Sequence, residues 1–396
     1  MASPAADARP PRAVIESKAA ATRGATPAPY ARQTMAGPSL LFTGPVTINV
    51  YGEAPAATGL SAQAEPALTV EPSAQATAGV EKKLRFDPDY ARREGYDPNF
   101  LGVPVPAPAV SAGRAGEMLT DAAGHALVLR YHHFELAMNR PRRLMMWSAV
   151  NVDYDPAKKA PGGRAAFGQD EWHADPRIPA AAQLQDADFY RPAGKIDRGH
   201  IVRREDNAWG KTPVEQEFAN SDTFHWTNCT PQHEAFNRAD PGRAYGTLQG
   251  LWGGFEQQVQ QGLQDVDHRA CLLAGPVLAA DDPSADFGAG PIQYPLLFWK
   301  IVCVTVSKAG MKAGGAPRLV VFGFLLSQQS VTDRFGIERF GPGKFARYQA
   351  TLTHIEEVTG LVFDHALHAA DTMRDAPAPR RAIQVASDIQ GLQSAA

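Results

Sequence analysis

Long runs of apolar and β-branched residues recur through the later two thirds of the 396-residue chain, and they constrain its fold more than any other feature. Each run has the length and composition of a strand, and polar or Gly- and Pro-rich stretches separate the runs. The runs lie at residues 126–131, 144–151, 269–274, 296–304 and 319–326. The basic turn at 139–143 precedes the second run, so we expect a hairpin between the first two. The pattern predicts an α+β fold with a mostly antiparallel sheet and helices on its faces.

Two segments instead carry the spacing of amphipathic helices. Between 248 and 263, apolar residues such as Leu251, Trp252, Phe255 and Val259 recur at intervals of three and four. This spacing places them on one face of a helix. A second helix is predicted over 350–358.

Composition divides the chain into three parts. Residues 1–84 are rich in Ala, Pro, Ser, Thr and Gly, and they cannot bury enough apolar area to offset chain entropy, so we expect them to be largely disordered. A β-branched island at 39–51 predicts a short strand there, either an edge strand on the main body or a segment that binds a partner. Residues 85–372 form the predicted folded domain, and 373–396 a disordered tail.

The overall charge sets limits on partners and location. A formal net charge of −3 means that the whole protein does not attract nucleic acid, so any attraction to phosphate must be local. The first eighteen residues lack the apolar core of a secretory signal, and eighteen apolar residues never run together. We therefore expect a cytoplasmic protein, or one exported without a cleaved signal peptide, and no membrane partner.

A constellation of polar residues in the middle of the chain carries the functional signal. The tetrapeptide Asp197–His200 is followed by Asn228 in Asn-Cys-Thr-Pro-Gln, then by Asn237, and then by Glu256 in Trp-Gly-Gly-Phe-Glu. A histidine, two asparagines and a glutamate in this order fit a one-metal site that cleaves phosphodiesters. Each piece is weak evidence alone, and the combination in one order is the argument.

The chemistry assigns a role to each of these residues. Phosphodiester hydrolysis needs a base for the attacking water, and the neutral imidazole of His200 can supply it. Arg198 offers a permanent cation whose fork fits phosphate oxygens, and Asp197 could orient a neighbour or the water shell of a metal. The amide oxygen of Asn237 is a suitable ligand for Mg²⁺, and Glu256 would orient metal-bound waters.

The sequence also resembles a known family. Its central tract, residues 197–210, resembles the DNA/RNA non-specific endonucleases of the ββα-metal (His-Me finger) class, and most closely their endonuclease G-like bacterial branch. Further matching stretches are residues 222–229, Gly275-Pro276, Phe298-Trp299-Lys300 and 356–361. The resemblance covers roughly residues 85 to 368. It implies His200 as general base, Asn237 as the Mg²⁺ ligand, an active-site role for Arg198 and Glu256, and Asn228 as a brace for the loop that carries Asn237.

Two departures from the family pattern affect the assignments. Residues 238–250 intervene between Asn237 and the helix, and Phe255 replaces the leucine of the family, which weakens the assignment of Glu256. The family also has a second catalytic arginine upstream of the tetrapeptide. Arg177 is the first candidate for it, Arg143 is the second, and a surface arginine is the alternative for both.

Basic residues crowd around the tetrapeptide within fourteen positions. They are Arg191, Lys195, Arg198, Arg203 and Arg204. This basic strip predicts contacts to the nucleic-acid backbone with weak sequence preference, and a solvated charged loop is the alternative.

The combined prediction is a Mg²⁺-dependent endonuclease, with Mn²⁺ as a substitute ion, that acts on DNA and/or RNA and leaves 5′-phosphate ends. Two alternatives stay open: a catalytically inactive nucleic-acid-binding protein on the same scaffold, and a phosphodiesterase with small substrates. A defence or toxin effector nuclease is a hypothesis motivated by the composition of residues 1–84. A homo-oligomer and a regulatory or inhibitor protein stay open as partners.

Overall fold

The computed structural model describes residues 86–383, apart from residue 169 and the segments 240–250, 267, 307–316 and 330–346. The predicted strand at 39–51 lies outside the described residues. Within them, no helix is long and apolar enough to cross a membrane.

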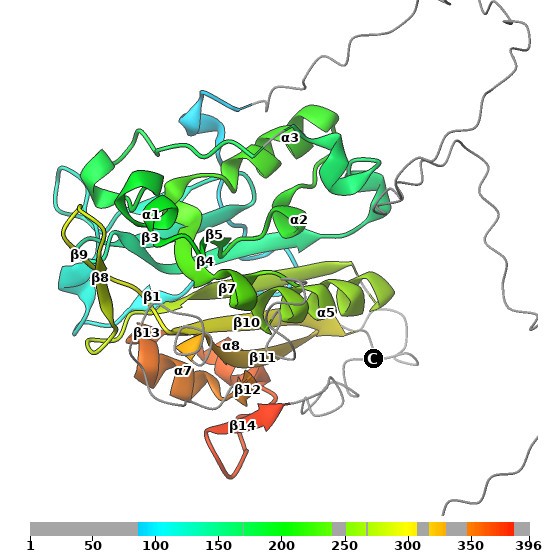
Figure 1. Cartoon of the computed structure of the whole chain (residues 1–396). Helices are drawn as coiled ribbons and strands as arrows, with labels where there is room; N and C mark the ends of the chain where they lie inside the picture. The colour runs from blue at the N-terminus through cyan, green and yellow to red at the C-terminus, as the bar shows by residue number, and fades with distance from the viewer. Residues whose placement is uncertain are drawn as a thin grey trace, which may run out of the picture. The chain divides into compact units, whose positions relative to one another are not determined.

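An eight-stranded sheet forms the centre of the described chain (Figure 1). Its strands are β2 (Val128–Arg130), β3 (Phe134–Asn139), β4 (Leu144–Asp153), β7 (Arg269–Val277), β10 (Leu297–Val306), β11 (Arg318–Ser327), β12 (Arg347–Ala350) and β14 (Arg380–Ile383). Their order across the sheet is β14-β12-β11-β10-β7-β4-β3-β2, and every neighbouring pair is antiparallel. The predicted α+β class with an antiparallel sheet is therefore confirmed.

Both faces of the sheet are covered, which explains why its central strands read as continuous apolar runs. All ten residues of β4 are buried. Alternate residues of β10 belong to two separate cores: Phe298 and Val302 to one, and Trp299 and Ile301 to the other. The sheet thus supports a layer of helices or loops on each side.

The two predicted helices lie on opposite faces of this sheet. Helix α5 (Leu251–Val266) contributes Trp252, Phe255 and Leu263 to the core that contains Phe298. Helix α7 (Leu352–Thr359) contributes Leu352 and Ile355 to the other core. It begins at the capping side chain of Thr351 and ends at Gly360, whose φ of 67° is left-handed.

Short elements complete the described chain. Its other α-helices are α1 (Arg191–Ala193), α2 (Arg204–Asn207), α3 (Pro213–Asp222), α4 (Glu234–Asn237) and α8 (His365–Ala370). Three two-stranded pairs join β1 (Ala109–Val110) with β13 (Leu361–Val362), β5 (Ile196–His200) with β6 (Cys229–His233), and β8 (Ser284–Asp286) with β9 (Pro291–Gln293). The remaining turns are the 3₁₀ helices η1 (Tyr90–Arg92), η2 (Ala115–Glu117), η3 (Pro156–Lys158), η4 (Gly163–Ala166), η5 (Ala180–Ala182) and η7 (Trp226–Asn228), and the π-helix η6 (Asp186–Tyr190).

The structure corrects the sequence prediction in two places. The basic turn at 139–143 joins β4 to β3 and not to the run at 126–131, because the intervening residues Phe134–Asn139 form a strand of their own. The sequence Phe-Glu-Leu-Ala-Met-Asn lacks β-branched residues, so its composition did not indicate a strand. The ordered body also extends beyond residue 372, because β14 pairs with β12 and buries Ile383.

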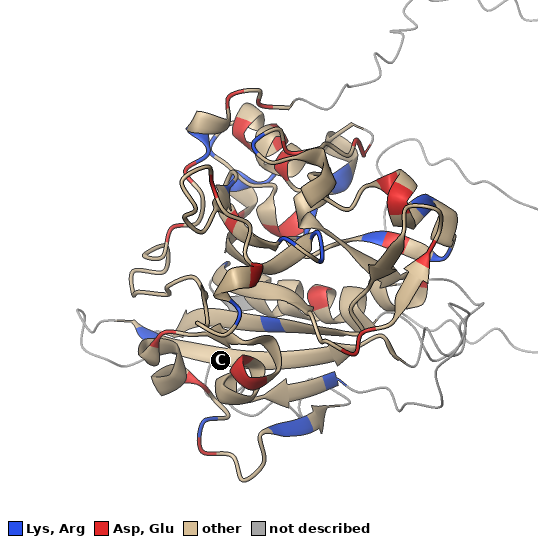
Figure 2. Ribbon diagram, turned by 90° about the vertical axis from the view of Figure 1, so that its left-hand side faces the viewer, with Lys and Arg blue, Asp and Glu red and all other residues tan. Residues whose placement is uncertain are grey.

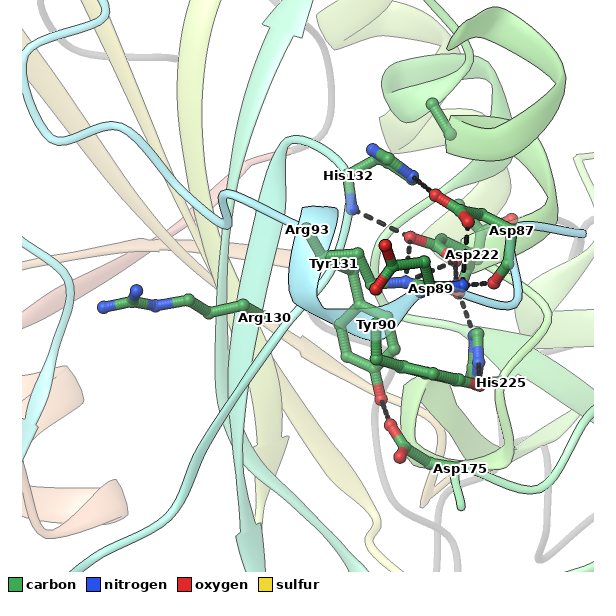
Figure 3. Close-up of polar contacts among 12 residues, drawn as sticks. Asp87, Asp89, Tyr90, Arg93, Arg130, Tyr131, His132, Asp175, Asp222 and His225 are labelled. Carbon is green, nitrogen blue, oxygen red and sulfur yellow. Dashed lines mark hydrogen bonds and ion pairs between the residues drawn. The ribbon is translucent and has the colours of Figure 1, made fainter. Parts of the chain in front are cut away.

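A buried ion pair ties the first described segment to the end of α3 (Figure 3). The guanidinium of Arg93 donates Nε to both carboxylate oxygens of Asp222 (3.1 and 2.9 Å) and Nη2 to Oδ1 (2.8 Å). Nη2 also donates to the backbone carbonyl of Asp87, and the backbone amide of His132 donates to Asp222. Both side chains of the pair are fully buried. The segment that contains Asp87 therefore belongs to the folded body.

Candidate functional site

A compact strand–strand–helix unit carries the tetrapeptide and Asn237. Strands β5 and β6 pair antiparallel, with His200 opposite Cys229 and Ile196 opposite His233, and α4 follows β6 directly. Helix α4 contacts both strands. This arrangement is a ββα unit, and it brings the tetrapeptide and the predicted metal ligand onto adjacent elements.

The glycine of the tetrapeptide is required by packing between the two strands. A Cβ atom at Gly199 would lie 2.2 Å from Oε1 of Gln232 on β6. The amide of Gln232 is buried, and neither its nitrogen nor its oxygen has a hydrogen-bond partner among the described residues. Any larger residue at position 199 would displace this side chain.

The imidazole of His200 is enclosed by aromatic rings. Its centroid lies 4.7 Å from the ring of Trp172 and 4.9 Å from that of Phe224, which meets it edge-on. Trp172 in turn stacks on Trp226, with 5.1 Å between centroids. Nε2 of His200 is buried and has no hydrogen-bond partner among the described residues. A buried polar atom without a protein partner costs stability, and a catalytic role is one explanation for keeping it.

The charge state of His200 follows from this enclosure. Burial, together with the positive charges of Arg204, Arg164 and Arg203, lowers the pKa of His200 to about 3. The imidazole is therefore neutral across the physiological pH range, which is the form that accepts a proton.

Asn237 lies at the end of α4 and is oriented by Asp197. Its Nδ2 donates to Oδ2 of Asp197 at 2.9 Å, and the guanidinium of Arg238 donates to both oxygens of the same carboxylate (2.9 and 2.7 Å). A carboxylate accepts hydrogen bonds, so the amide nitrogen faces Asp197 and the amide oxygen points elsewhere. Asn237 and His200 share one ββα unit but form no hydrogen bond with each other, and Asp197 and His200 are about 10 Å apart along β5.

Asn228 braces the segment that follows His200. The side chain accepts from the backbone amide of Val202 (2.9 Å) and donates to the carbonyls of Val202 and Thr223 (2.8 and 2.9 Å). It is fully buried. The expectation that Asn228 braces the loop of Asn237 is therefore corrected: its hydrogen bonds hold the chain on the His200 side of the unit.

Helix α5 returns to the end of α4 in spite of the intervening residues 238–250. A Cβ atom at Gly253 would lie 2.4 Å from the carbonyl oxygen of Asn237 and 2.6 Å from the amide nitrogen of Ala239. The glycine therefore permits backbone-to-backbone contact with the segment that carries Asn237. At the adjacent Gly254, an added Cβ would meet no atom within 4 Å.

Glu256 lies one turn further along α5, in a buried charge network. Its Oε1 accepts from Nζ of Lys300 on β10 at 2.7 Å, and Oε2 lies 3.9 Å from Nε of Arg203. Burial raises the pKa of the Glu256 carboxyl, and the charges of Lys300 and Arg203 oppose that rise. The network connects α5 to Arg203, three residues after His200.

Arg198 and Arg191 of the basic strip share one carboxylate. Arg198 donates Nε to Oδ1 of Asp186 at 2.8 Å, and Arg191 donates Nε to Oδ2 at 3.0 Å. Figure 2 shows basic and acidic residues interspersed over the ribbon as a whole. The strip is therefore charge-compensated rather than uniformly positive.

The other members of the strip differ in burial. Arg203 pairs with Glu205 (3.1 Å), and Arg204 pairs with Asp170 (2.7 Å), whereas Lys195 is exposed. Arg204 itself is buried. The crowding of these residues in the sequence does not produce one continuous basic surface.

Arg177 occupies a structural position. Its guanidinium pairs with Asp175 (Nη2 to Oδ2, 2.7 Å), donates to the carbonyl of Arg130 and lies over the rings of Tyr90 and Tyr131. Asp175 also accepts from the Tyr131 hydroxyl, as Figure 3 shows. The structure thus ties Arg177 to the packing beside the Arg93–Asp222 pair and not to the ββα unit. The second candidate, Arg143, pairs with Asp188.

Sequence reasoning missed the aromatic enclosure and two charged residues beside it. Trp172, Arg164 and Asp170 come from a loop-rich stretch with no periodicity. Phe224 lies in a stretch that matched the family, but nothing in that stretch singled it out. Among the described residues, no group of three or more His, Cys, Asp or Glu side chains is arranged to hold a metal ion.

The chain is similar to known proteins in sequence and in fold. A family model described as DNA/RNA non-specific endonuclease matches residues 113–370. A curated relative, the uncharacterized protein y4fB of Sinorhizobium fredii (strain NBRC 101917 / NGR234), is 34% identical over 311 residues. That alignment covers 75% of this chain and 43% of the relative, so the chain spans less than half of the relative's length. Among solved structures, the EndoG/EndoGI complex is similar with a TM-score of 0.43 and 18% identity, over 61% of this chain and 86% of that chain.

Proposed function

We propose that this chain, which belongs to the DNA/RNA non-specific endonuclease family, is a Mg²⁺-dependent endonuclease that hydrolyses DNA, with RNA as a second substrate, to 5′-phosphate ends. The observation that carries the proposal is the enclosed, neutral imidazole of His200 with its unpartnered Nε2. A neutral imidazole at the end of the tetrapeptide strand is suited to accept the proton of an attacking water.

The electrostatics of the site favour a phosphate substrate. Burial, and after it the cations around His200, lower the pKa of the imidazole and make it a weak base in the free protein. A phosphate anion bound among those cations would offset their charge and raise the pKa of His200 toward its ordinary value. The base would therefore become stronger when substrate is present.

The donor set around Asn237 fits a hard divalent cation. Asp197 holds the amide nitrogen, and the amide oxygen accepts no hydrogen bond from the other described residues. An amide oxygen is a ligand type that Mg²⁺ and Mn²⁺ accept, with water completing the shell. When bound, the ion would supply positive charge to the scissile phosphate and the leaving oxygen. Glu256, buried on the neighbouring helix, is proposed to orient the water around it.

Replacing Asn237 with Ala tests the metal assignment. Asn237→Ala should lose plasmid cleavage by about 10²-fold or more, because the ion loses its protein ligand. Mg²⁺ titrations of cleavage, with and without EDTA, and isothermal titration with Mn²⁺ measure activity and metal affinity in parallel. A variant with normal turnover at low Mg²⁺ would remove Asn237 from the metal site. Cleavage by the unsubstituted chain in EDTA would overturn the metal requirement itself.

Gly253 provides a test with a matched control in the same helix. Gly253→Ala should lower cleavage by about 10- to 100-fold, because its Cβ would displace the backbone beside Asn237. Gly254→Ala meets no neighbour, so its activity should be unchanged. Cleavage rates and melting temperatures of both variants measure the difference. Equal activity in the two variants would show that the approach of α5 to Asn237 does not position the site.

The pH dependence of catalysis tests the state of His200. Because the folded-state pKa is depressed to about 3, the imidazole stays neutral as pH falls from 7.5 to 5. The specificity constant kcat/KM reports groups of the free enzyme, so it should show no loss from His200 protonation in that range. Initial rates on a quenched-fluorescent oligonucleotide at saturating Mg²⁺ measure it. An acid limb centred near the ordinary histidine pKa of about 6.5 would contradict the enclosure of His200.

A further inference from the structure

The carboxylate of Asp170 lies between two guanidinium groups whose charges act on His200. Oδ1 of Asp170 accepts from Nη1 of Arg204 at 2.7 Å, and Oδ2 accepts from Nη2 of Arg164 at 3.1 Å. Each carboxylate oxygen of Asp170 thus accepts a hydrogen bond from a different arginine. A phosphodiester presents two anionic oxygens in a comparable way.

Other residues hold the side chain of Arg204 in place, but one of its guanidinium nitrogens has no hydrogen-bond partner among the described residues. Arg204 is only 6% exposed. Its Nε donates to Oδ1 of Asn220, and its guanidinium carbon lies 5.2 Å from the centroid of the Phe224 ring. Its Nη2 is buried and has no hydrogen-bond partner among the described residues. A fixed guanidinium with an unused donor is prepared for a further acceptor oxygen.

This pair of arginines lies next to the proposed base. The ring of Phe224 contacts both the imidazole of His200 (4.9 Å) and the guanidinium of Arg204 (5.2 Å). The charges of Arg204 and Arg164 also act on His200. An anion held by the two arginines would therefore add a negative charge close enough to act on the imidazole.

We propose that Arg204 and Arg164 form a clamp for a backbone phosphate of the nucleic acid beside His200, and that Asp170 occupies this clamp until substrate displaces it. The inference rests on the proposed nuclease function and adds an internal competitor to it. Displacement is feasible because the Arg164–Asp170 contact is exposed on both sides, with side-chain exposures of 66% and 41%. Arg204 stays in place, since Asn220 and Phe224 hold it independently of Asp170.

Binding measurements without turnover test the clamp. The full chain is titrated into a fluorescent 20-base-pair duplex in EDTA buffer at 150 mM salt, and anisotropy gives Kd. Asp170→Asn should tighten binding by up to about fivefold, because the arginines lose their internal partner. The adjacent Glu171→Gln is the matched control: it removes the same charge from an exposed residue that pairs with no arginine among the described residues. It should change Kd by less than about twofold, because it releases no arginine from an ion pair and salt screens the general effect of its charge.

A double variant tests whether Arg164 binds the phosphate once Asp170 no longer pairs with it. Arg164→Ala combined with Asp170→Asn should lose most of the gain of the single variant, since one arm of the clamp is absent. Equal Kd values for Asp170→Asn and Glu171→Gln would overturn the inference, and so would a gain that persists in full in the double variant. These outcomes are separate from the nuclease proposal. A chain that never cleaves in Mg²⁺ but shows the Asp170 effect would refute only the proposed activity.

Discussion

His200→Ala is expected to lower phosphodiester cleavage by about 10²- to 10⁴-fold while leaving the affinity for nucleic acid unchanged. The reason is that the imidazole supplies the proton acceptor, whereas arginine residues supply the attraction to phosphate. Plasmid nicking in Mg²⁺ measures the first quantity, and anisotropy of a labelled duplex in EDTA measures the second. Full activity in the variant would remove His200 from the mechanism.

A loss of folding must be separated from this loss of chemistry. His125→Ala serves as the matched control, because its side chain is 80% exposed in a turn and should leave cleavage unchanged. The melting temperature of His200→Ala should fall only modestly, because the loss of packing is partly offset by removal of the unpartnered Nε2. A cleaving His200→Ala chain and an inactive His125→Ala chain would each contradict the assignment.

Removing the charge of Arg93 should cause a large loss of stability. Arg93→Met leaves the carboxylate of Asp222 buried without its partner, and breaking such a pair costs about 3–5 kcal/mol. Equilibrium unfolding in urea measures this free energy. The neighbouring Arg92→Ala is the matched control, because its ion pair with Asp89 is exposed and should contribute less than about 1 kcal/mol.

The cause of this loss can be separated from lost packing. If the unpaired buried charge of Asp222 causes most of the loss, the double variant Arg93→Met with Asp222→Leu should be more stable than Arg93→Met alone. The double variant should still be less stable than the unsubstituted chain, because Asp222 also accepts a hydrogen bond from the backbone amide of His132 and leucine cannot. A single-variant loss no larger than that of Arg92→Ala would show that the segment around Arg93 is not anchored as the contacts indicate.

The locally encoded parts of the fold were predictable. Apolar runs at 144–151, 296–304 and 319–326 match strands β4, β10 and β11 within about two residues, because a strand buried on both faces needs such a run. The helix at 248–263 also matches α5 over the described residues. Strand β3 escaped prediction, because none of its apolar residues is β-branched.

The candidate site was also predictable only in part. The order of His200, Asn228, Asn237 and Glu256 is a property of the chain, and it was sufficient to indicate a phosphodiester-cleaving family. Which groups face them is decided by segments far apart in sequence. The Lys300 partner of Glu256 comes from β10, 44 positions later in the sequence.

The arginines show most clearly the difference between what the sequence indicates and what the fold decides. The sequence places Arg204 in the basic strip and makes Arg177 the first candidate for the second arginine of the family, but it does not show which charge either one faces. The fold pairs Arg177 with Asp175 and places Arg204 against Phe224, which also touches His200. Sequence alone determined the long central strands, the residue types and their order, because these depend on local periodicity and chemistry. Only the tertiary structure decided which charge each arginine neutralises, because that depends on which distant segments the packing of the core brings together.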